Sequence, residues 1–131
     1  ANTTPLWIAC CLANIQIVKE LLQSKSIDVN LSDSDGKTPF FIAFENNNYD
    51  IVKVLLQDSR FSLDSTSKIK DSQSRNILWY SVRNNNLEMI KLILSSKSID
   101  VNLSDSDGKT PLLIAFENNY FDIVKVLLQD Q

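Results

Sequence analysis

Histidine is absent from this chain of 131 residues. Its absence removes the most common general base, the Ser–His and Cys–His nucleophile pairs, and every metal site that needs an imidazole ligand. A reaction would have to depend on carboxylates and lysine alone, and these residues form no catalytic pattern in the sequence. We therefore expect a chain that is not an enzyme and that carries no catalytic residue, metal site or cofactor.

Cysteine is nearly absent, and the two that are present, Cys10 and Cys11, are adjacent. Adjacent side chains on a helix point about 100° apart, so a disulfide between them is not expected. The chain also lacks the further Cys or His residues that a zinc site would need. Reduced thiols are typical of a reducing compartment, and we expect an intracellular, cytoplasmic protein.

Long apolar runs and basic clusters are missing as well. No stretch approaches the roughly 18 residues of a membrane span, and the first residues lack the pattern of a signal peptide. The formal net charge is −3, with Lys mixed among Asp and Glu, which argues against a nucleic-acid surface. We expect neither a membrane nor a nucleic acid as partner. The apolar fraction of 44%, with only two glycines and three prolines, favours ordered globular structure.

The main feature that the chain does have is internal repetition. Residues 24–58 and 96–130 differ at only four aligned positions. Throughout the chain, a triplet related to Thr-Pro-Leu is followed 13 positions later by one related to Ile-Val-Lys. These pairs of triplets begin at residues 4 and 17, 38 and 51, 76 and 89, and 110 and 123. Such self-similarity predicts a fold that stacks copies of one small unit and presents surfaces rather than enclosing an active site.

This spacing divides a single domain, residues 1–131, into four units. The units cover approximately residues 1–31, 32–65, 66–103 and 104–131. The first unit lacks its leading loop, and the third has four extra residues in its own. The chain therefore looks like part of a longer array.

The two ends of such an array would expose apolar side chains. Cys11 and Leu12 of the first unit lie where apolar side chains should not face water without reason, and we expect them to contact a preceding repeat. In the fourth unit we expect parts of Phe121, Ile123 and Leu127 to be exposed. These uncapped ends would allow the chain to associate with itself.

The second unit shows how one repeat is built. Thr38 and Pro39 predict the start of a helix, because the threonine hydroxyl can accept from a first-turn amide and proline fits the first helical position. Residues 40–44 are apolar on all sides, as in a helix packed between neighbours. Asn47 favours a left-handed turn, and the apolar stripe of residues 49–57 predicts a second helix. Two antiparallel helices result.

A loop rich in Ser and Asp precedes the second, third and fourth helix pairs, and before the second pair it covers residues 24–37. We expect a short extended stretch across Ile27, Val29 and Leu31, followed by a turn at residues 33–36. The turn is a poor match to a calcium loop, because the first and twelfth ligands would be Leu31 and Ile42. We interpret it as an Asp/Gly turn, and its serines as turn formers rather than kinase targets.

These residues resemble the ankyrin-repeat family. The family signature D-x-x-G-x-T-P-L-H-x-A is matched by DSDGKTPFFIA (33–43) and DSDGKTPLLIA (105–115), and the resemblance covers essentially the whole chain. It implies an all-α repeat solenoid of stacked antiparallel helix pairs with β-hairpin or loop fingers. It also implies that the chain binds other proteins through a concave face made of fingers and first helices.

The chain departs from the family pattern at two repeated positions. Apolar side chains replace the histidine, so apolar packing must substitute for its hydrogen bond with threonine; they are Trp7, Phe41, Trp79 and Leu113. The glycine of the turn between the helices is also replaced, by Ala13, Asn47, Asn85 and Asn119. We expect the turn at Ala13 to fit least well. In the third unit, Asn76 stands in place of threonine and should still cap its helix.

The resemblance places a partner on the fingers and on the ends of the first helices. In the second unit the residues are Ser34, Asp35, Lys37, Glu45 and Asn46, and in the fourth they are Ser106, Asp107, Lys109, Glu117 and Asn118. The third unit would contribute Lys68, Lys70, Arg75, Arg83 and Asn84. This order predicts a face that runs acidic, basic, acidic and that selects a partner of complementary charge.

The sequence therefore predicts a non-catalytic protein–protein interaction scaffold. The alternative is a structural spacer, or an intramolecular regulatory segment of a larger multidomain protein. A third interpretation, an enzyme that uses carboxylates of the third finger, would need a pocket with strongly shifted acids there.

Overall fold

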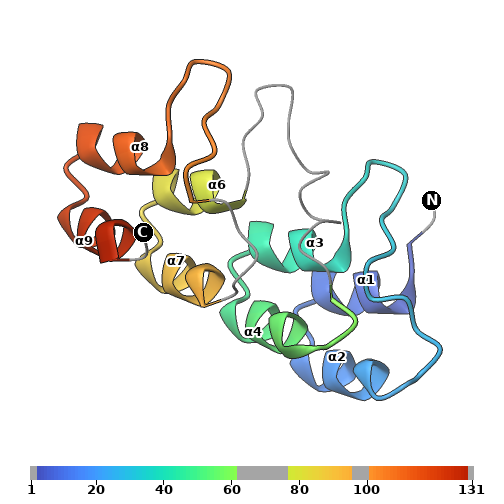
Figure 1. Cartoon of the computed structure of the whole chain (residues 1–131). Coiled ribbons are helices and arrows are strands. Elements are labelled where there is room, and N and C mark those ends of the chain that lie inside the picture. The colour runs from blue at the N-terminus through green and yellow to red at the C-terminus, as the bar shows by residue number, and fades with distance from the viewer. Residues whose placement is uncertain (1–2, 62–76, 96–100, 130–131) are drawn as a thin grey trace. The chain divides into compact units, whose positions relative to one another are not determined.

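The computed structural model describes residues 3–61, 77–95 and 101–129. Within these ranges the regular secondary structure is α-helical, without a β-strand, and the helices come in antiparallel pairs joined by short turns (Figure 1). No helix in the described ranges meets the length and apolarity that crossing a membrane requires. The four units predicted from the sequence are called repeats from here on. The chain forms two compact units, residues 1–68 and 69–131, and each unit contains two helix pairs.

In the first unit, α1 (Pro5–Cys11) pairs with α2 (Ile15–Leu22), and α3 (Pro39–Glu45) pairs with α4 (Tyr49–Gln57). The two pairs stack, with α1 against α3 and α2 against α4. The second helix predicted over residues 49–57 is confirmed. The fully buried side chains of this unit include Leu6, Val18, Phe40, Val52 and Leu55.

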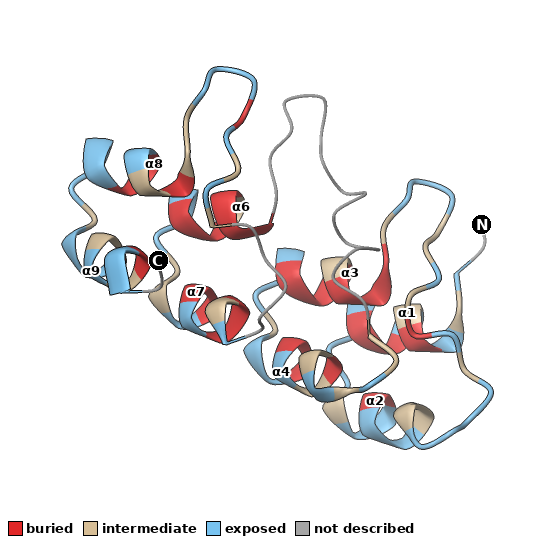
Figure 2. Cartoon of the chain, viewed as in Figure 1, coloured by how far each residue is buried: buried red, intermediate tan, exposed pale blue. Residues whose placement is uncertain are grey.

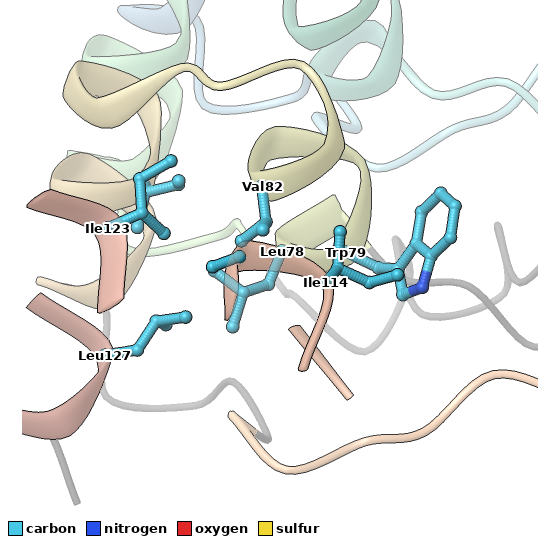
Figure 3. Close-up of a cluster of buried hydrophobic side chains, with 8 residues drawn as sticks. Leu78, Trp79, Val82, Ile114, Ile123 and Leu127 are labelled. Atoms are coloured by element: carbon cyan, nitrogen blue, oxygen red, sulfur yellow. The ribbon is translucent and has the colours of Figure 1, made fainter. Parts of the chain in front are cut away.

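The second unit repeats this plan. Its pairs are α6 (Ile77–Arg83) with α7 (Leu87–Leu94), and α8 (Pro111–Glu117) with α9 (Phe121–Gln129). Here α6 packs against α8, and α7 against α9. The core that they enclose includes Leu78, Trp79, Val82, Ile114, Ile123 and Leu127 (Figure 3). The helix pair expected in the divergent third repeat is therefore present.

Threonine caps start the first helices as the sequence predicts. The Thr38 hydroxyl oxygen accepts a hydrogen bond from the Phe41 amide at 3.1 Å, and Pro39 occupies the first turn. Thr4 and Thr110 make the equivalent bonds, at 3.1 and 3.2 Å. The cap expected from Asn76 lies outside the described residues.

Each turn between paired helices contains one residue in the left-handed conformation. The φ angles are 58° at Ala13, 57° at Asn47, 54° at Asn85 and 60° at Asn119. The prediction for asparagine is confirmed, and Ala13 adopts the same geometry although its Cβ disfavours it. The turn at Ala13 is therefore formed, with backbone strain.

Burial corrects one expectation about the end of the chain. Ile123 and Leu127 are only 1% and 2% exposed, because they face the core of their own unit. The expectation that they are partly exposed was wrong, whereas Phe121 is 71% exposed as expected. Leu12 is also 71% exposed, and its expected contact with a preceding repeat stays a prediction. In Figure 2 the buried residues concentrate where the helices of each unit meet.

The apolar residues that replace histidine differ in how well they pack. Trp79 is buried, Trp7 and Phe41 are half-buried, and Leu113 is exposed. Apolar packing therefore substitutes for the lost polar contact in the first three repeats and only weakly in the fourth.

The two cysteines are free and lie in different environments. Cys10 is buried and Cys11 is exposed. Burial, with a contribution from the neighbouring Cys11, raises the pKa of the Cys10 thiol to about 12. Cys10 therefore remains a protonated, apolar core residue near neutral pH.

The strain at Ala13 gives a first prediction. Ala13→Gly should raise the free energy of unfolding by roughly 0.5–1 kcal/mol, because relief of the left-handed conformation exceeds the entropy that glycine adds to the unfolded chain. Urea unfolding followed by circular dichroism measures the change. Asn85→Gly is the matched control, and it should shift stability by at most a few tenths of a kcal/mol, since asparagine tolerates this conformation. Equal effects of the two substitutions would contradict the prediction.

Candidate partner-binding surface

Each described finger ends in a turn that an aspartate holds together. The Asp33 Oδ1 atom accepts from the amides of Asp35 and Lys37, both at 2.9 Å, while the Gly36 amide donates to the Asp33 carbonyl at 3.1 Å. Gly36 has a φ of 80°, which an L side chain rarely adopts. These bonds confirm the interpretation of D-x-x-G as an Asp/Gly turn.

The copy of this turn in the second unit is built in the same way. Asp105 Oδ1 accepts from the amides of Asp107 and Lys109, both at 2.9 Å. Because the turn amides donate to these aspartate oxygens, the main role of the aspartate side chains is to stabilise the turn. Among the described residues, no group of three or more His, Cys, Asp or Glu is placed to hold a metal ion.

The fingers are loops rather than β-hairpins in their described residues. In the expected extended stretch, Val29 is buried, Ile27 is half-buried and Leu31 is 47% exposed. The expected alternation therefore holds at Ile27 and Val29 and fails at Leu31, and the described fingers have the loop form.

An ion pair connects each finger to the end of its first helix. Lys37 Nζ lies 3.3 Å from Glu45 Oε2, and Lys109 Nζ lies 3.1 Å from Glu117 Oε2. Lys37 Nζ also lies 5.8 Å from the centroid of the Phe41 ring. The structure thus brings together the predicted finger and helix residues within each unit. Each glutamate is partly neutralised by its own repeat.

The other predicted residues of the second and fourth repeats are accessible. Ser34, Asp35, Ser106 and Asp107 are exposed at the finger tips, and Asn46 and Asn118 follow the last turns of α3 and α8. The Asn118 side-chain amide donates to the Ile114 carbonyl at 2.8 Å, which holds it against α8.

Two of the five residues predicted for the third repeat lie within the described ranges. Arg83 and Asn84 are exposed at the end of α6, and the guanidinium carbon of Arg83 lies 5.6 Å from the Trp79 ring centroid. Lys68, Lys70 and Arg75 lie outside the described residues. The predicted order of charge along the face therefore stays a prediction.

We use the name finger–helix surface for the described candidate residues of both units. It comprises Ser34, Asp35, Lys37, Glu45 and Asn46 in the first unit and Arg83, Asn84, Ser106, Asp107, Lys109, Glu117 and Asn118 in the second.

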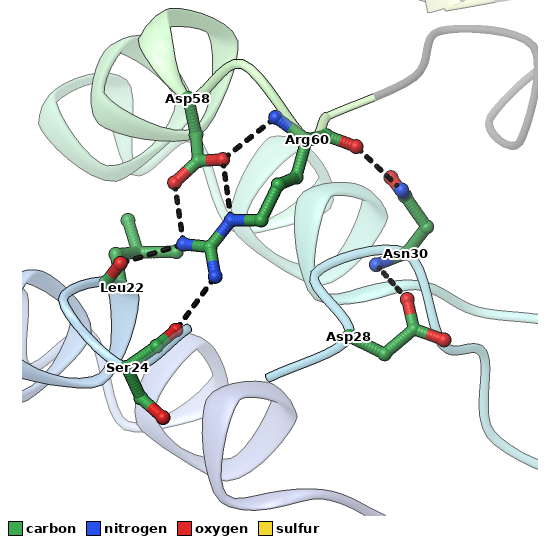
Figure 4. Close-up of polar contacts among 6 residues, drawn as sticks. All are labelled: Leu22, Ser24, Asp28, Asn30, Asp58 and Arg60. Carbon is green, nitrogen blue, oxygen red and sulfur yellow. Dashed lines mark hydrogen bonds and ion pairs between the residues drawn. The ribbon is translucent and has the colours of Figure 1, made fainter. Parts of the chain in front are cut away.

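Sequence reasoning missed a polar cluster centred on Arg60 (Figure 4). Its guanidinium donates to the Leu22 carbonyl at 2.6 Å and to the Ser24 carbonyl at 2.7 Å. It also forms a two-point contact with the Asp58 carboxylate, at 2.8 and 3.0 Å. The Asn30 amide donates to the Arg60 carbonyl at 2.9 Å. The cluster joins the C-terminal ends of α2 and α4.

One sequence signal could have pointed to this cluster. Arg60 occupies the repeat position that holds Ser26 and Ser98 in the neighbouring copies. An arginine in that position reaches carbonyls at the C-terminal end of a helix, where a positive charge is favourable. The informative feature is thus the residue that departs from the repeat, and not one that the repeats share.

The cluster predicts how stability depends on pH. Hydrogen bonding to Arg60 lowers the pKa of Asp58 below its ordinary value of 3.8. The ionised form is thus favoured by folding, and its contribution is complete above pH 3.8 and lost as the pH falls towards the folded-state pKa. Arg60→Gln should lower the melting temperature at pH 7, with the difference from wild type narrowing below about pH 4.

The part of the change in melting temperature that depends on pH reports the ion pair, and the part that does not depend on pH reports the carbonyl contacts. Leu22 and Ser24 carbonyls do not titrate, so some difference should persist in acid. Arg83→Gln is the matched control, because no carboxylate pairs with Arg83 among the described residues. Its effect on the melting temperature should change little between pH 7 and pH 3. A pH-independent effect of Arg60→Gln would contradict the assignment.

The finger ion pairs should contribute little to folding. Their side chains are 38% and 49% exposed in the first unit, so water and salt screen the attraction. A double-mutant cycle of Lys37→Ala and Glu45→Ala should give a coupling of about 0.2–1 kcal/mol that decreases in high salt. A coupling well above this range would show a structural role, and it would make Glu45 unsuitable for testing binding.

The chain belongs to the ankyrin-repeat family. The family model described as ankyrin repeats (3 copies) matches residues 1–67 and again residues 60–131. A crystal structure of an ankyrin repeat domain from Acinetobacter baumannii is similar in fold, with a TM-score of 0.77 at 22% identity. The similarity covers 96% of this chain and 61% of that one. Ankyrin repeats are generally protein–protein interaction modules and are typically non-enzymatic.

Three curated relatives are much longer than this chain. A probable serine/threonine-protein kinase of Dictyostelium discoideum is 27% identical over 95% of this chain, which spans 15% of that protein. The human transient receptor potential cation channel subfamily A member 1 is 26% identical over 96% of this chain, which spans 11% of it. Alpha-latrocrustotoxin-Lt1a of Latrodectus tredecimguttatus is 40% identical over 40% of this chain, equal to 4% of the toxin.

Proposed function

We propose that this chain is a non-catalytic module that binds another protein through the finger–helix surface. The observation that carries the proposal is the recurrence of one arrangement in both units. An exposed finger tip, an Asp-closed turn and a Lys–Glu pair at the end of a first helix occur at residues 33–45 and again at residues 105–117.

The arrangement is suited to recognition because it is fixed before a partner arrives. Two amides bind Asp33 and two bind Asp105, which limits the conformations of each tip. A pre-ordered loop loses less conformational entropy on binding than a flexible one. The exposed serines and carboxylates then offer hydrogen-bonding and charged groups to the partner, with charge setting specificity and association rate.

The partner in this proposal is a polypeptide, and the module works in a reducing compartment such as the cytoplasm. The free thiols of Cys10 and Cys11 suit that compartment. Apolar side chains are also exposed, including Leu12, Phe116 and Phe121. In this proposal they allow two copies of the chain to associate.

A structural spacer or an intramolecular regulatory segment is the second candidate. It is favoured by the small share of the kinase and channel relatives that this chain matches, 15% and 11% of their lengths. In such a setting the finger–helix surface would contact a neighbouring part of the same protein. Binding to a separate partner would then be weak or absent, because the contact would depend on covalent connection.

Affinity capture from the lysate of the source cell tests the proposal. The test variant combines Glu45→Ala, Arg83→Ala, Asn84→Ala and Glu117→Ala on the finger–helix surface. The control combines Glu20→Ala, Lys53→Ala, Gln57→Ala and Glu88→Ala, which are exposed positions of second helices. The two variants change the net charge equally. Circular dichroism and melting curves confirm that both fold as the wild type does.

We expect wild type and control to retain a discrete partner that the test variant loses, with affinity reduced by at least about tenfold if these residues include binding hot spots. Equal loss in both variants would contradict the assignment to this surface. Capture of no discrete protein by any of the three would favour the spacer or the intramolecular segment.

A further inference from the structure

Each unit also has a groove that the finger–helix surface does not include. In the first unit it has a volume of about 340 Å³ and lies between the turn after α1, at Ala13 and Ile15, and residues 47–51. In the second it has about 460 Å³ and lies between Asn85 and Leu87 and residues 119–123. Each lining residue of one groove is 72 positions from its counterpart in the other. The groove is therefore a property of the stacked helix pair.

In each groove, an aromatic side chain and a carboxylate lie beside aliphatic side chains. In the first unit, Ile51 is buried, Ile15 is half-buried, and Tyr49 and Asp50 are exposed. Ile123, Leu87, Phe121 and Asp122 take these roles in the second. Tyr49 is 37% exposed and Phe121 is 71% exposed. Both aromatic residues can therefore contact a ligand.

The carboxylates in the grooves form no ion pair with any residue of the described ranges. The ion pairs among the described residues join Lys37 to Glu45, Arg60 to Asp58 and Lys109 to Glu117. Asp50 and Asp122 take part in none of them. This contrasts with the glutamates of the finger–helix surface, and it leaves one uncompensated negative charge beside an aromatic ring in each unit.

The start of α4 also lacks the cap that its counterparts have. Asn14 and Asn86 each accept a backbone hydrogen bond, from Ile17 and Met89, at 3.2 and 3.1 Å. Asn48, in the same position, makes no side-chain cap bond. The Asn48 side chain thus does not accept from the first-turn amides of α4, and the carbonyl oxygen of a bound peptide is an acceptor of the kind that such amides take.

We infer that each groove binds an arginine side chain presented by an extended segment of a partner polypeptide. The guanidinium stacks on Tyr49 or Phe121 and pairs with Asp50 or Asp122. A planar guanidinium suits both contacts, since it stacks on aromatic rings and donates two parallel hydrogen bonds to a carboxylate. In the first groove, a backbone carbonyl of the segment accepts from the first turn of α4.

The chain itself shows that one of these rings attracts a cation. Lys125 Nζ lies 5.5 Å from the centroid of the Phe121 ring. This internal contact competes with an incoming arginine in the second groove, whereas no such contact involves Tyr49 among the described aromatic contacts. The first groove is therefore the stronger of the two. The positive end of the helix dipole weakens cation binding at both, and the carboxylate opposes that effect.

The inference is tested by amide NMR of the full chain with two blocked pentapeptides. One has a central arginine flanked by Gly and Ser, and in the other citrulline, which is neutral and of similar shape, replaces the arginine. The arginine peptide should give saturable shifts at Asp50 and Ile51, and weaker ones at Asp122 and Ile123. The citrulline peptide should bind at least about fivefold more weakly, because the charge-assisted contacts are lost.

Two double variants assign the binding to the grooves. Asp50→Asn with Asp122→Asn should weaken arginine-peptide binding at least about fivefold. Glu20→Gln with Asp28→Asn removes the same charge from exposed positions that lie outside both grooves and outside the finger–helix surface, and it should change the affinity less than about twofold. Tyr49→Ala should weaken binding in the first groove alone.

Equal weakening by the two double variants would show general charge attraction and overturn the inference. So would shifts confined to the fingers, or the absence of saturable shifts at Asp50 and Ile51. These results would leave the proposed function of the finger–helix surface intact, because the peptide titration needs no natural partner. Loss of capture by the finger–helix variant would likewise leave the groove assignment untouched.

Discussion

The structure depends on burying first helices that are apolar on nearly every side. Phe40, Ala43 and Phe44 of α3 are all buried, although the helix has only seven residues. So short a helix is not stable alone in water, and its stability must come from its neighbours. Within the first unit those neighbours are α1 and α4, and the small side chains of Ala9 and Ala43 fit this close packing. Stacking therefore follows directly from composition, and the tight left-handed turn follows from the need to return the chain along the same helix.

The features that could be predicted from sequence are those set by local chemistry. Threonine caps, proline at helix starts, asparagine in left-handed turns and the helix over residues 49–57 each depend on a few adjacent residues, and the repeats supply independent copies of them. The burial of Ile123 and Leu127 could not be judged in this way. It depends on how α9 packs against α7 and α8, and that packing covers both side chains without a further repeat. Phe121, at the start of the same helix, lies outside this core and is exposed.

The candidate surface also has features that adjacent residues determine and features that depend on contacts between distant segments. Family resemblance placed Lys37 and Glu45 on a finger and at a helix end, but it did not show that they pair at 3.3 Å. The sequence marks Arg60 as an exception to the repeat, but it does not identify the carbonyl acceptors of the guanidinium, which lie 36 and 38 residues away. The grooves likewise require two turns from different repeats to lie side by side. In each case the missing information was contact between segments distant in sequence, which periodicity indicates only in outline.

Internal pairing also determines where the acidic excess of the chain can act. The formal charge is −3, yet Glu45, Asp58 and Glu117 are each paired with a cation of the same unit, and Asp33 is engaged by turn amides. The described carboxylates left without an ion pair include those of the grooves and the finger tips. A basic partner would therefore compete with Lys37 and Lys109 at the glutamates of the first helices, whereas at the turns it would meet carboxylates without an ion pair. Because both units carry the same groove, a partner with two suitably spaced arginines could occupy both and gain avidity without any new kind of contact.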